Sequence, residues 1–269
     1  MTSACRLLAI LILAASGALV CSEARAVPLT TNLAGYWQFD GNGADASGNG
    51  LPVTVNGAGG YATGILGQAL NLPNVYADNA TRPGDDTAFD FGFNDFSIQI
   101  WAKFNSVSAV QVLIEKLTGS GSQGWSLYLQ NSTALQFFTV GSATLTTSGV
   151  TFTTGTWYDI VIRRNASNWE IDVNGVSRST ASNNGTITTS TSPLLIGERD
   201  APAGQGLQTN GLVDEVAIWT RFLTTAEVTS LYNGGAPLSI QALAAPEPEA
   251  AGCALVLLAI SALALRRAG

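Results

Sequence analysis

The clearest structural signal in the chain is the stretch Trp169-Glu170-Ile171-Asp172-Val173-Asn174-Gly175-Val176-Ser177-Arg178-Ser179. Apolar and polar residues alternate up to Val173, which is the period of a β-strand. Asn174-Gly175 fits a type I′ turn, because both central positions of that turn need positive φ. A further strand is predicted over residues 157–163, ahead of a turn at Asn165–Asn168. This part of the chain therefore predicts consecutive strands joined by tight turns.

Comparable segments recur on both sides of this stretch. Within residues 96–104, Ile98, Ile100, Ala102 and Phe104 share one face. Further strands are predicted over residues 124–130, 135–140, 194–197 and 211–219. One short helix follows a capping box at Thr224-Thr225-Ala226-Glu227 and ends at Asn233-Gly234-Gly235. Ten or more short strands at this spacing predict an all-β fold of two stacked antiparallel sheets.

The order of these segments resembles the laminin G-like, concanavalin A-like jelly roll in its bacterial form. The matching phrases include Leu33–Gly41, Asp45–Gly50, Gly67–Leu70, Phe96–Trp101, Thr156–Tyr158, Val173–Gly175 and Gly211–Val216 with Trp219. The resemblance implies one jelly-roll domain over residues 27–240, in which the first and last strands are neighbours. Residues 77–91 depart from the pattern with Asp78, Asp85, Asp86 and Asp90, and we interpret them as a longer surface loop.

The first 26 residues have the pattern of a secretory signal peptide. Arg6 precedes an apolar stretch over residues 7–20, and Ala24-Arg25-Ala26 offers a cleavage site before Val27. Lipidation at Cys21 is an alternative, but Val20 stands where a lipoprotein signal has a small residue. We expect export through the general secretion machinery and a mature chain that starts at Val27.

The last residues, 241–269, resemble the PEP-CTERM sorting signal of Gram-negative bacteria, which an exosortase reads. Pro246-Glu247-Pro248 precedes the apolar residues 250–264, and Arg266-Arg267 follows them. A helix over that apolar run spans about 22 Å, short of a hydrocarbon core of about 30 Å, although a plain membrane anchor remains the alternative. The resemblance implies hydrophobic helices at both chain ends, transient anchoring in the inner membrane, and a final place on the cell surface or in the extracellular matrix.

Composition restricts the chemistry. The chain has no histidine, and its three cysteines, Cys5, Cys21 and Cys253, all lie in the two end segments. This pattern opposes Ser-His-Asp catalysis, thiol nucleophiles and thiolate metal sites in the body. Residues 27–245 contain eight Lys and Arg against sixteen Asp and Glu, a net charge of −8, which disfavours nucleic acid as a partner.

The loop over residues 40–50 concentrates oxygen ligands on a glycine-rich backbone, as a calcium site requires. Its spacing is not that of an EF-hand. Because similar jelly rolls carry a structural calcium near the first and last strands, the resemblance implies Ca²⁺ bound by Asp40 and Asp214. The alternative is a turn held by Asx hydrogen bonds without a metal.

The sequence carries no clear catalytic pair. Jelly-roll glycosidases place acids in a Glu-x-Asp-x-x-Glu pattern, and here Glu170 and Asp172 are followed by Gly175 in place of the third acid. We interpret this segment as a solvated hairpin at a sheet edge, and Arg163-Arg164 as a solvated strand end. Asp214 and Glu215 are expected on opposite sides of their strand, where they could not form a dyad.

Tryptophans could form a sugar-stacking platform. The candidates are Trp37, Trp101, Trp125, Trp157, Trp169 and Trp219. Five of them lie in strand contexts typical of a core, whereas Trp169 follows a polar turn and is expected to be exposed, like Tyr61 and Tyr76 in loops.

These observations favour a non-enzymatic, exported module that binds glycan or another matrix component through the loops at one rim of the sandwich. Two alternatives stay open: a polysaccharide hydrolase or lyase on the same fold, and a purely structural coat or biofilm protein. Fold alone does not separate them.

Overall fold

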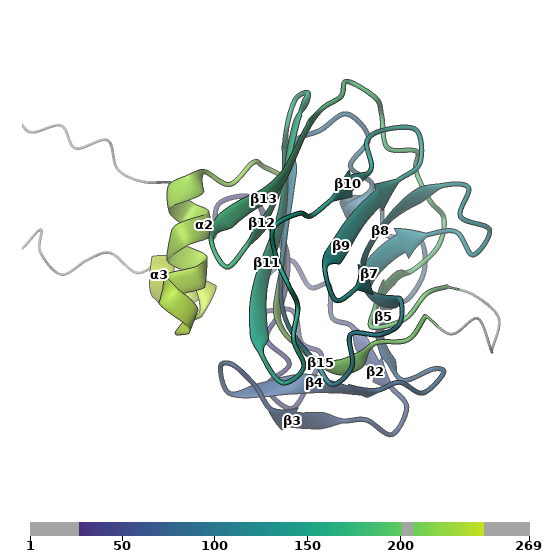
Figure 1. Ribbon diagram of the computed structural model, residues 1–269, viewed down its shortest axis with the longest axis vertical. Helices are drawn as coiled ribbons and strands as arrows, with labels where there is room; N and C mark the ends of the chain where they lie inside the picture. Colours follow the sequence, from purple (N-terminus) through teal and green to yellow (C-terminus); the bar gives the residue numbers. More distant parts are fainter. Residues whose placement is uncertain (1–26, 201–206, 245–269) are drawn as a thin grey trace, which may run out of the picture.

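The structure is a computed structural model that describes residues 27–200 and 207–244 (Figure 1). Two antiparallel sheets stack face to face, and one short helical region follows the last strand. The predicted all-β jelly-roll sandwich is therefore confirmed. The predicted signal peptide, the sorting signal and the hydrophobic helices at both chain ends lie outside the described residues, so those assignments stay predictions.

Sheet A carries the strand on which the sequence prediction was centred. Its order is β13 (Val176–Ser182), β12 (Asn168–Val173), β11 (Trp157–Asn165), β6 (Phe96–Phe104), β15 (Asn210–Trp219), β4 (Gln68–Pro73) and β3 (Tyr61–Thr63), with β1 (Leu33–Trp37) also paired to β15. Asn174 and Gly175 both have positive φ, 53° and 71°, as the predicted hairpin turn requires. The first and last strands, β1 and β15, are neighbours as expected.

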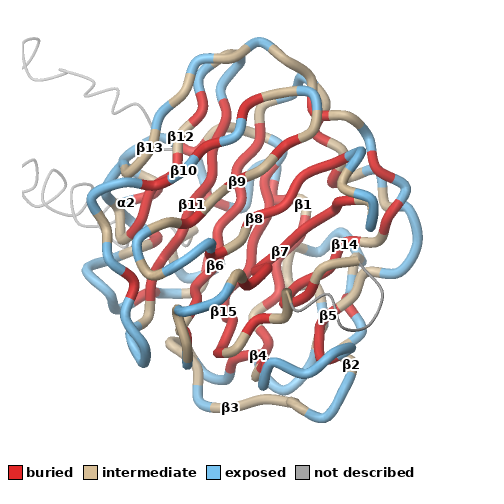
Figure 2. Tube along the Cα trace, turned by 45° about the vertical axis from the view of Figure 1, so that its right-hand side comes forward, coloured by how far each residue is buried: buried red, intermediate tan, exposed pale blue. Residues whose placement is uncertain are grey.

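Sheet B packs over the inner face of sheet A. Its order is β10 (Leu145–Thr146), β9 (Ala134–Thr139), β8 (Gly124–Asn131), β7 (Gln111–Leu117), β14 (Leu194–Ile196), β5 (Asn79–Arg82) and β2 (Thr54–Asn56). Buried residues follow the strands and exposed ones gather in the connecting loops (Figure 2). The core between the sheets is rich in aromatic residues: Phe96 stacks on Phe91 at 4.0 Å between ring centroids and meets Trp169 edge to face at 5.7 Å.

Within the described residues, the three helices that follow the last strand lie against sheet A (Figure 1). They are α2 (Thr225–Tyr232), the 3-10 helix η2 (Asn233–Gly235) and α3 (Ile240–Ala244), while the 3-10 helix η1 (Thr87–Phe89) lies near the strand ends. The predicted capping box is present at Thr224 and Glu227, and Asn233 closes α2 with a left-handed backbone. None of these helices is long and apolar enough to cross a bilayer.

Residues 77–91 are not the surface loop that the sequence suggested. Strand β5 and helix η1 both lie inside this stretch, and Asp78 is buried. Ion pairs explain the density of acids, because Asp85 and Asp90 contact Lys116 and Asp86 contacts Arg82. The acids therefore anchor this segment to sheet B.

Candidate functional site

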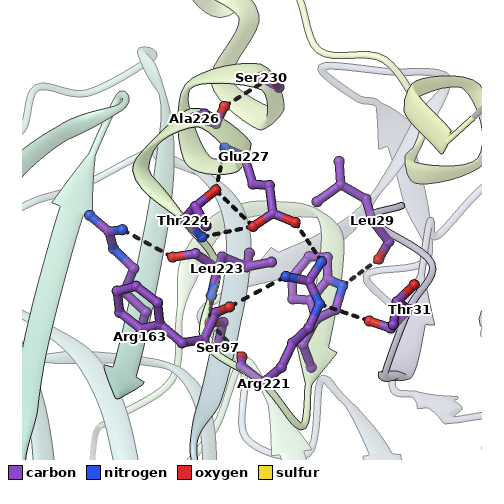
Figure 3. A network of polar contacts seen from close by, with 12 residues as sticks. Leu29, Thr31, Ser97, Arg163, Arg221, Leu223, Thr224, Ala226, Glu227 and Ser230 are labelled. Atoms are coloured by element: carbon purple, nitrogen blue, oxygen red, sulfur yellow. Dashed lines mark hydrogen bonds and ion pairs between the residues drawn. The ribbon is translucent and has the colours of Figure 1, made fainter. Parts of the chain in front are cut away.

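The outer face of sheet A, covered by α2 and α3, is hereafter the covered face. A cluster of apolar side chains lies beneath the helices, including Leu223, Val228 and Leu231. Polar contacts join the same region (Figure 3): the Ser97 hydroxyl donates to the Arg221 carbonyl and accepts from the Leu223 amide, both at 2.9 Å. These contacts position the helix on the sheet.

Arg163 is the charged centre of the covered face. Its guanidinium donates to both carboxylate oxygens of Asp172, at 2.8 and 3.1 Å, and to the Leu223 carbonyl at 3.0 Å. Glu170 completes the ion pair at 2.7 Å. Arg163 and Asp172 are both almost fully buried, so the expected solvated strand end is wrong. The expected edge position of residues 170–172 is also wrong, because β13 covers that side of β12.

Glu170 and Asp172 are therefore both engaged by the Arg163 guanidinium. Burial raises the pKa of Asp172, the bonds from Arg163 lower it, and the Glu170 charge raises it again. The two acids are thus held in a largely buried ion pair on the covered face, and not in the solvated hairpin that the sequence suggested.

A fork in sheet A places the predicted metal ligands. One edge of β15 pairs with β4 up to Val213 and with β1 from Val216 onward, and Asp214 and Glu215 lie between the two strands. Asp214 Oδ2 accepts the amides of Ile65 and Leu66, at 2.9 and 3.2 Å. Asp40 Oδ1 accepts the Gln68 amide at 2.7 Å, so both predicted ligands hold the same turn.

The pairing of β15 shifts register between Asp214 and Ala217, and Glu215 has φ of 48°. Trp101, opposite Asp214, stacks on Tyr232 of α2, while Glu215 accepts the Tyr36 hydroxyl beneath the helices. Both acids therefore face outward, and the expectation of opposite sides is wrong because a bulge interrupts the alternation.

Burial raises the pKa of Asp214 to about 7 and that of Glu215 to about 8, and the Asp40 charge adds to both shifts. Glu215 Oε1 is buried and has no hydrogen-bond partner among the described residues. An orphaned carboxylate oxygen beside two further acids suits a hard cation. However, nowhere in residues 27–200 and 207–244 do three acidic side chains gather closely enough to hold a metal by themselves, so backbone oxygens would have to complete the coordination.

The hollow part of the surface lies at one end of the sandwich, where β1 and β6 begin and β11 and β15 end. A cavity of about 600 Å³ is lined there by residues that include Asp90, Phe91, Phe93, Asn94 and Asp95. A second cavity, of about 310 Å³ and lined in part by Asn32 and Asn49, shares Ala88 and Thr220 with the first. We name the two cavities together the rim groove. The volume of the larger one lies in the usual range for ligand pockets, about 300–1,000 Å³.

The loop over residues 91–95 gives the rim groove its aromatic side chain. Phe91 is buried against Phe96 and Trp125, whereas the Phe93 side chain is 67% exposed. Gly92 stands between them with φ of 54°, and the Asn94 amide closes the turn on the Phe91 carbonyl at 2.8 Å. One phenyl ring therefore anchors the loop while the other is presented to solvent.

Arg164 fixes the loops around the rim groove from below. Its guanidinium donates to three backbone carbonyls, of Ala166, Gly92 and Gly185, at 2.8, 2.7 and 3.0 Å. It also lies over the Trp169 ring at 4.6 Å and is 1% exposed. The expected solvated charge is therefore wrong for Arg164 as well. A planar fork with several donors suits this task, since one side chain fixes three loops.

Lys116 supports the other side of the rim groove. Its fully buried ammonium contacts Asp85 and Asp90 at 2.9 and 2.8 Å and also donates to the Ser190 carbonyl. Asp90 lines the groove, so this ion pair fixes one of its walls.

Glu115, on sheet B, has the ionisation suited to acid catalysis, because burial raises its pKa to about 7. Yet the side chain is 0% exposed. One carboxylate oxygen accepts the Ser126 hydroxyl and the other accepts the Asp200 amide, both at 2.8 Å. Among the described residues, both oxygens of this carboxyl group are therefore satisfied inside the protein.

The tryptophans form no platform. Trp37, Trp101, Trp125, Trp169 and Trp219 are each at most 1% exposed, and Trp157 alone is half-buried. The expected exposure of Trp169 is wrong, because Arg164 and Phe96 cover it. Tyr76 is exposed as expected, while Tyr61 is half-buried and begins strand β3. Sequence reasoning missed Phe93; its available signal was a second phenylalanine beside Gly92, ahead of Asn94 and Asp95.

Comparison with solved structures finds the same fold in binding domains. The chain superposes on the binding domain of Paraclostridial Mosquitocidal Protein 1 with a TM-score of 0.64 and 18% identity, covering 77% of this chain and 53% of that one. For the Botulinum neurotoxin serotype G binding domain the TM-score is 0.59, with 16% identity and coverage of 75% and 50%. The chain thus spans about half the length of these two domains.

A shorter domain matches over nearly its whole length. It is domain 4 of AbnA, a GH43 extracellular arabinanase from Geobacillus stearothermophilus, in complex with arabinotriose. The TM-score is 0.54 and the identity 19%, with 74% of this chain and 97% of that one covered. At such identities the likeness extends to the fold alone.

No curated protein sequence matches the chain. The sequence model of the Laminin_G_3 family, described as concanavalin A-like lectin/glucanases superfamily, matches residues 73–229, more than half of the chain. The matched region runs from the end of β4 into α2 and so includes the loop over residues 91–95 and most of both sheets. The chain belongs to the Laminin_G_3 family of the concanavalin A-like lectin/glucanases superfamily.

Proposed function

We propose that the protein is an exported, non-enzymatic module that binds a glycan in the rim groove. The observation that carries this proposal is the combination of exposed Phe93 with Asn94 and Asp95 along a cavity of about 600 Å³. A flat aromatic ring packs against the apolar face of a sugar ring, and planar amides and carboxylates bond its hydroxyls. The arabinanase domain, described in complex with arabinotriose, supports this ligand class on this fold.

Support also comes from how the groove is held. Arg164 and Lys116 are both fully committed beneath it, and the loop over residues 91–95 is closed by its own hydrogen bond. A surface fixed before the ligand arrives loses little conformational freedom on binding. The two alternatives have weaker support. Glu115 is enclosed, which disfavours hydrolysis by that carboxyl group. A purely structural role in a coat does not account for a preformed groove with an exposed phenyl ring.

The test is a glycan array with the full-length chain in mild detergent, comparing wild type with Phe93→Ala. We expect saturable binding that weakens at least about tenfold in the variant, as for the loss of an aromatic anchor. Tyr76→Ala is the matched control, since Tyr76 is 49% exposed at the opposite end of the sandwich, near the Asn210 end of β15. Equal affinities for wild type and Phe93→Ala would remove the rim groove from the proposal.

Export and sorting are part of the same proposal. Cleavage after Ala24-Arg25-Ala26 would leave Val27 at the amino end, and an exosortase would act at Pro246-Glu247-Pro248, ahead of the apolar run and Arg266-Arg267. The protein would then reside on the cell surface or in the extracellular matrix. Intact-mass analysis of secreted protein tests both ends, and a full-length chain retained inside the cell contradicts the proposal.

We also propose a structural Ca²⁺ at the fork in sheet A, held in part by Asp40 and Asp214. Binding to the folded state alone raises its stability by about 2.7 kcal/mol when the free ion is at 100 times its Kd. The expected result is a higher Tm in calcium than in excess chelator, with the increment lost in Asp214→Asn. Identical midpoints in the two buffers would leave Asp40 and Asp214 as turn-holding residues only.

A further inference from the structure

We infer that the rim groove accepts uncharged saccharides and rejects acidic ones, an inference that rests on the proposed function and names its ligand class. The charged side chains that line the larger cavity are Asp90 and Asp95, and no Lys or Arg of the described residues lines either cavity. The other polar side chains that line it, such as Asn94 and Thr87, are neutral. An acidic sugar would therefore meet carboxylates and no positively charged side chain among the lining residues.

The two cations that bond residues lining the larger cavity are already used by the protein. Lys116 donates to Asp85, Asp90 and the Ser190 carbonyl, which occupies all three ammonium hydrogens. Arg164 uses its Nε and both terminal nitrogens on backbone carbonyls, and one face of its guanidinium on Trp169. Both side chains are at most 1% exposed. Neither can turn toward a carboxylate or sulfate without releasing the loops that form the groove.

The charges of the acids are offset but not reversed. Asp95 lies close enough to raise the pKa of Arg164, which burial lowers, and it also accepts the Ala166 amide at 2.7 Å. The positive charge of Lys116 neutralises one of the two carboxylates that it contacts, Asp85 and Asp90. The net charge around the groove is therefore close to zero on the negative side, which suits a ligand that binds through hydroxyls. The chain as a whole has a net charge of −7, which adds long-range repulsion of polyanions.

Long-range and local effects separate with salt. At about 1 M salt the screening length falls to about 3 Å, so repulsion by the distant surface disappears while contact with Asp95 persists. We expect the full-length protein to bind each neutral oligosaccharide of an array at least about tenfold more tightly than its uronic acid or sulfated analogue. That preference should survive, reduced, at 1 M salt.

Two substitutions assign the selectivity to the rim groove. Asp95→Asn keeps an acceptor for the Ala166 amide, and we expect it to narrow the ratio of neutral to acidic affinity about threefold or more, with both affinities measured on the same variant. Asn94→Asp adds a carboxylate at an exposed lining position and should widen the same ratio. Asn131→Asp is the matched control, because it makes the same change in net charge in the β8–β9 turn, at the other end of sheet B.

The outcomes distinguish the two proposals. Equal or tighter binding of the acidic analogues, lost in Phe93→Ala, overturns this inference and keeps the glycan-binding function. The inference is also overturned if the ratio of neutral to acidic affinity is unchanged in both Asp95→Asn and Asn94→Asp. The same holds if Asn131→Asp shifts that ratio as much as Asn94→Asp does. If wild type binds no saccharide, or binds as well after Phe93→Ala, the proposed function itself fails.

Discussion

Arg163 and Arg164 are adjacent on β11, yet they stabilise two different regions of the molecule. Arg163 lies on the covered face and bonds Asp172, Glu170 and the start of α2. Arg164 lies at the core end of the strand and bonds three loop carbonyls around the rim groove. Because successive side chains of a strand point to opposite faces, one dipeptide serves both regions.

The two regions use buried charge differently. On the covered face the cation is paired with acids, and helices α2 and α3 close the surface above it. At the rim groove the cation is satisfied by backbone carbonyls, and the neighbouring Phe93 and Asn94 remain open to solvent. The first arrangement holds the fold together, while the second holds an open surface in shape.

The largest expected effect is on the covered face. Arg163→Ala leaves Asp172 buried without its partner, and breaking such a pair costs about 3–5 kcal/mol of unfolding free energy. We expect urea unfolding to reveal that loss, while the folded fraction keeps its affinity for glycan.

Arg82→Ala is the matched control, because the Arg82–Asp86 pair is partly exposed and such pairs contribute about 0–1 kcal/mol. Equal losses in the two variants would mean that the Arg163 pair is not special. A fall in glycan affinity in Arg163→Ala would mean that the two regions are coupled.

The strands and the capped helix could be read from sequence because their signals are local. The alternation in residues 96–104, the Asn174-Gly175 turn and the Thr224–Glu227 box each specify geometry within a few residues, and β6, the hairpin and α2 follow them. Strand β7 was missed: Glu115 and Lys116 interrupt its apolar run, and both are buried only because partners from distant segments satisfy them.

The candidate site could not be read in the same way. Whether Arg164 is solvated or buried depends on Gly92 and Gly185, which lie 72 and 21 residues away in the chain. The same holds for Asp214, whose acceptor bonds come from Ile65 and Leu66. Long-range partners of this kind leave no periodic signal in a single sequence.

A second prediction concerns pH and the covered face. Burial raises the pKa of Asp159 to about 7; the Gln99 bond opposes the shift and the Asp172 charge adds to it. An unfolded aspartate titrates near about 3.9, so between about pH 4 and 7 the folded state binds the proton more tightly. Stability from this group is therefore present below about pH 4 and is lost as pH rises to about 7.

Asp159→Asn cannot ionise, so the variant does not lose stability at this position as the pH rises. We expect the difference in Tm, variant minus wild type, to increase from pH 4 to pH 7.5. Asp45→Asn gives the opposite sign and at lower pH, because burial alone would raise the pKa of Asp45 but hydrogen bonds from Ser47, Leu51 and Tyr36 lower it. Stability from Asp45 is therefore lost as pH falls below about 4, so the difference in Tm for this variant changes there and not between pH 4 and 7.5. A difference in Tm for Asp159→Asn that does not vary with pH would mean that this carboxyl is ionised in the folded protein throughout.

The smallest expected effect on stability is that of Arg164→Lys. It separates the rim groove from the covered face most clearly, because it changes glycan binding more than folding. Arg164→Lys keeps the charge but replaces a planar fork with a single ammonium, which cannot reach three carbonyls and stack on Trp169 at once. We expect glycan affinity to fall about tenfold, with only a modest drop in Tm.

Thr224→Ala is the control on the covered face: it removes the cap of α2, lowers stability by about 1 kcal/mol, and should leave glycan affinity unchanged. Both affinities are measured well below either Tm, so that unfolding contributes nothing. If the two variants bind glycan equally well, the loops that Arg164 holds do not shape the binding surface, and the difference between the two regions is one of position alone.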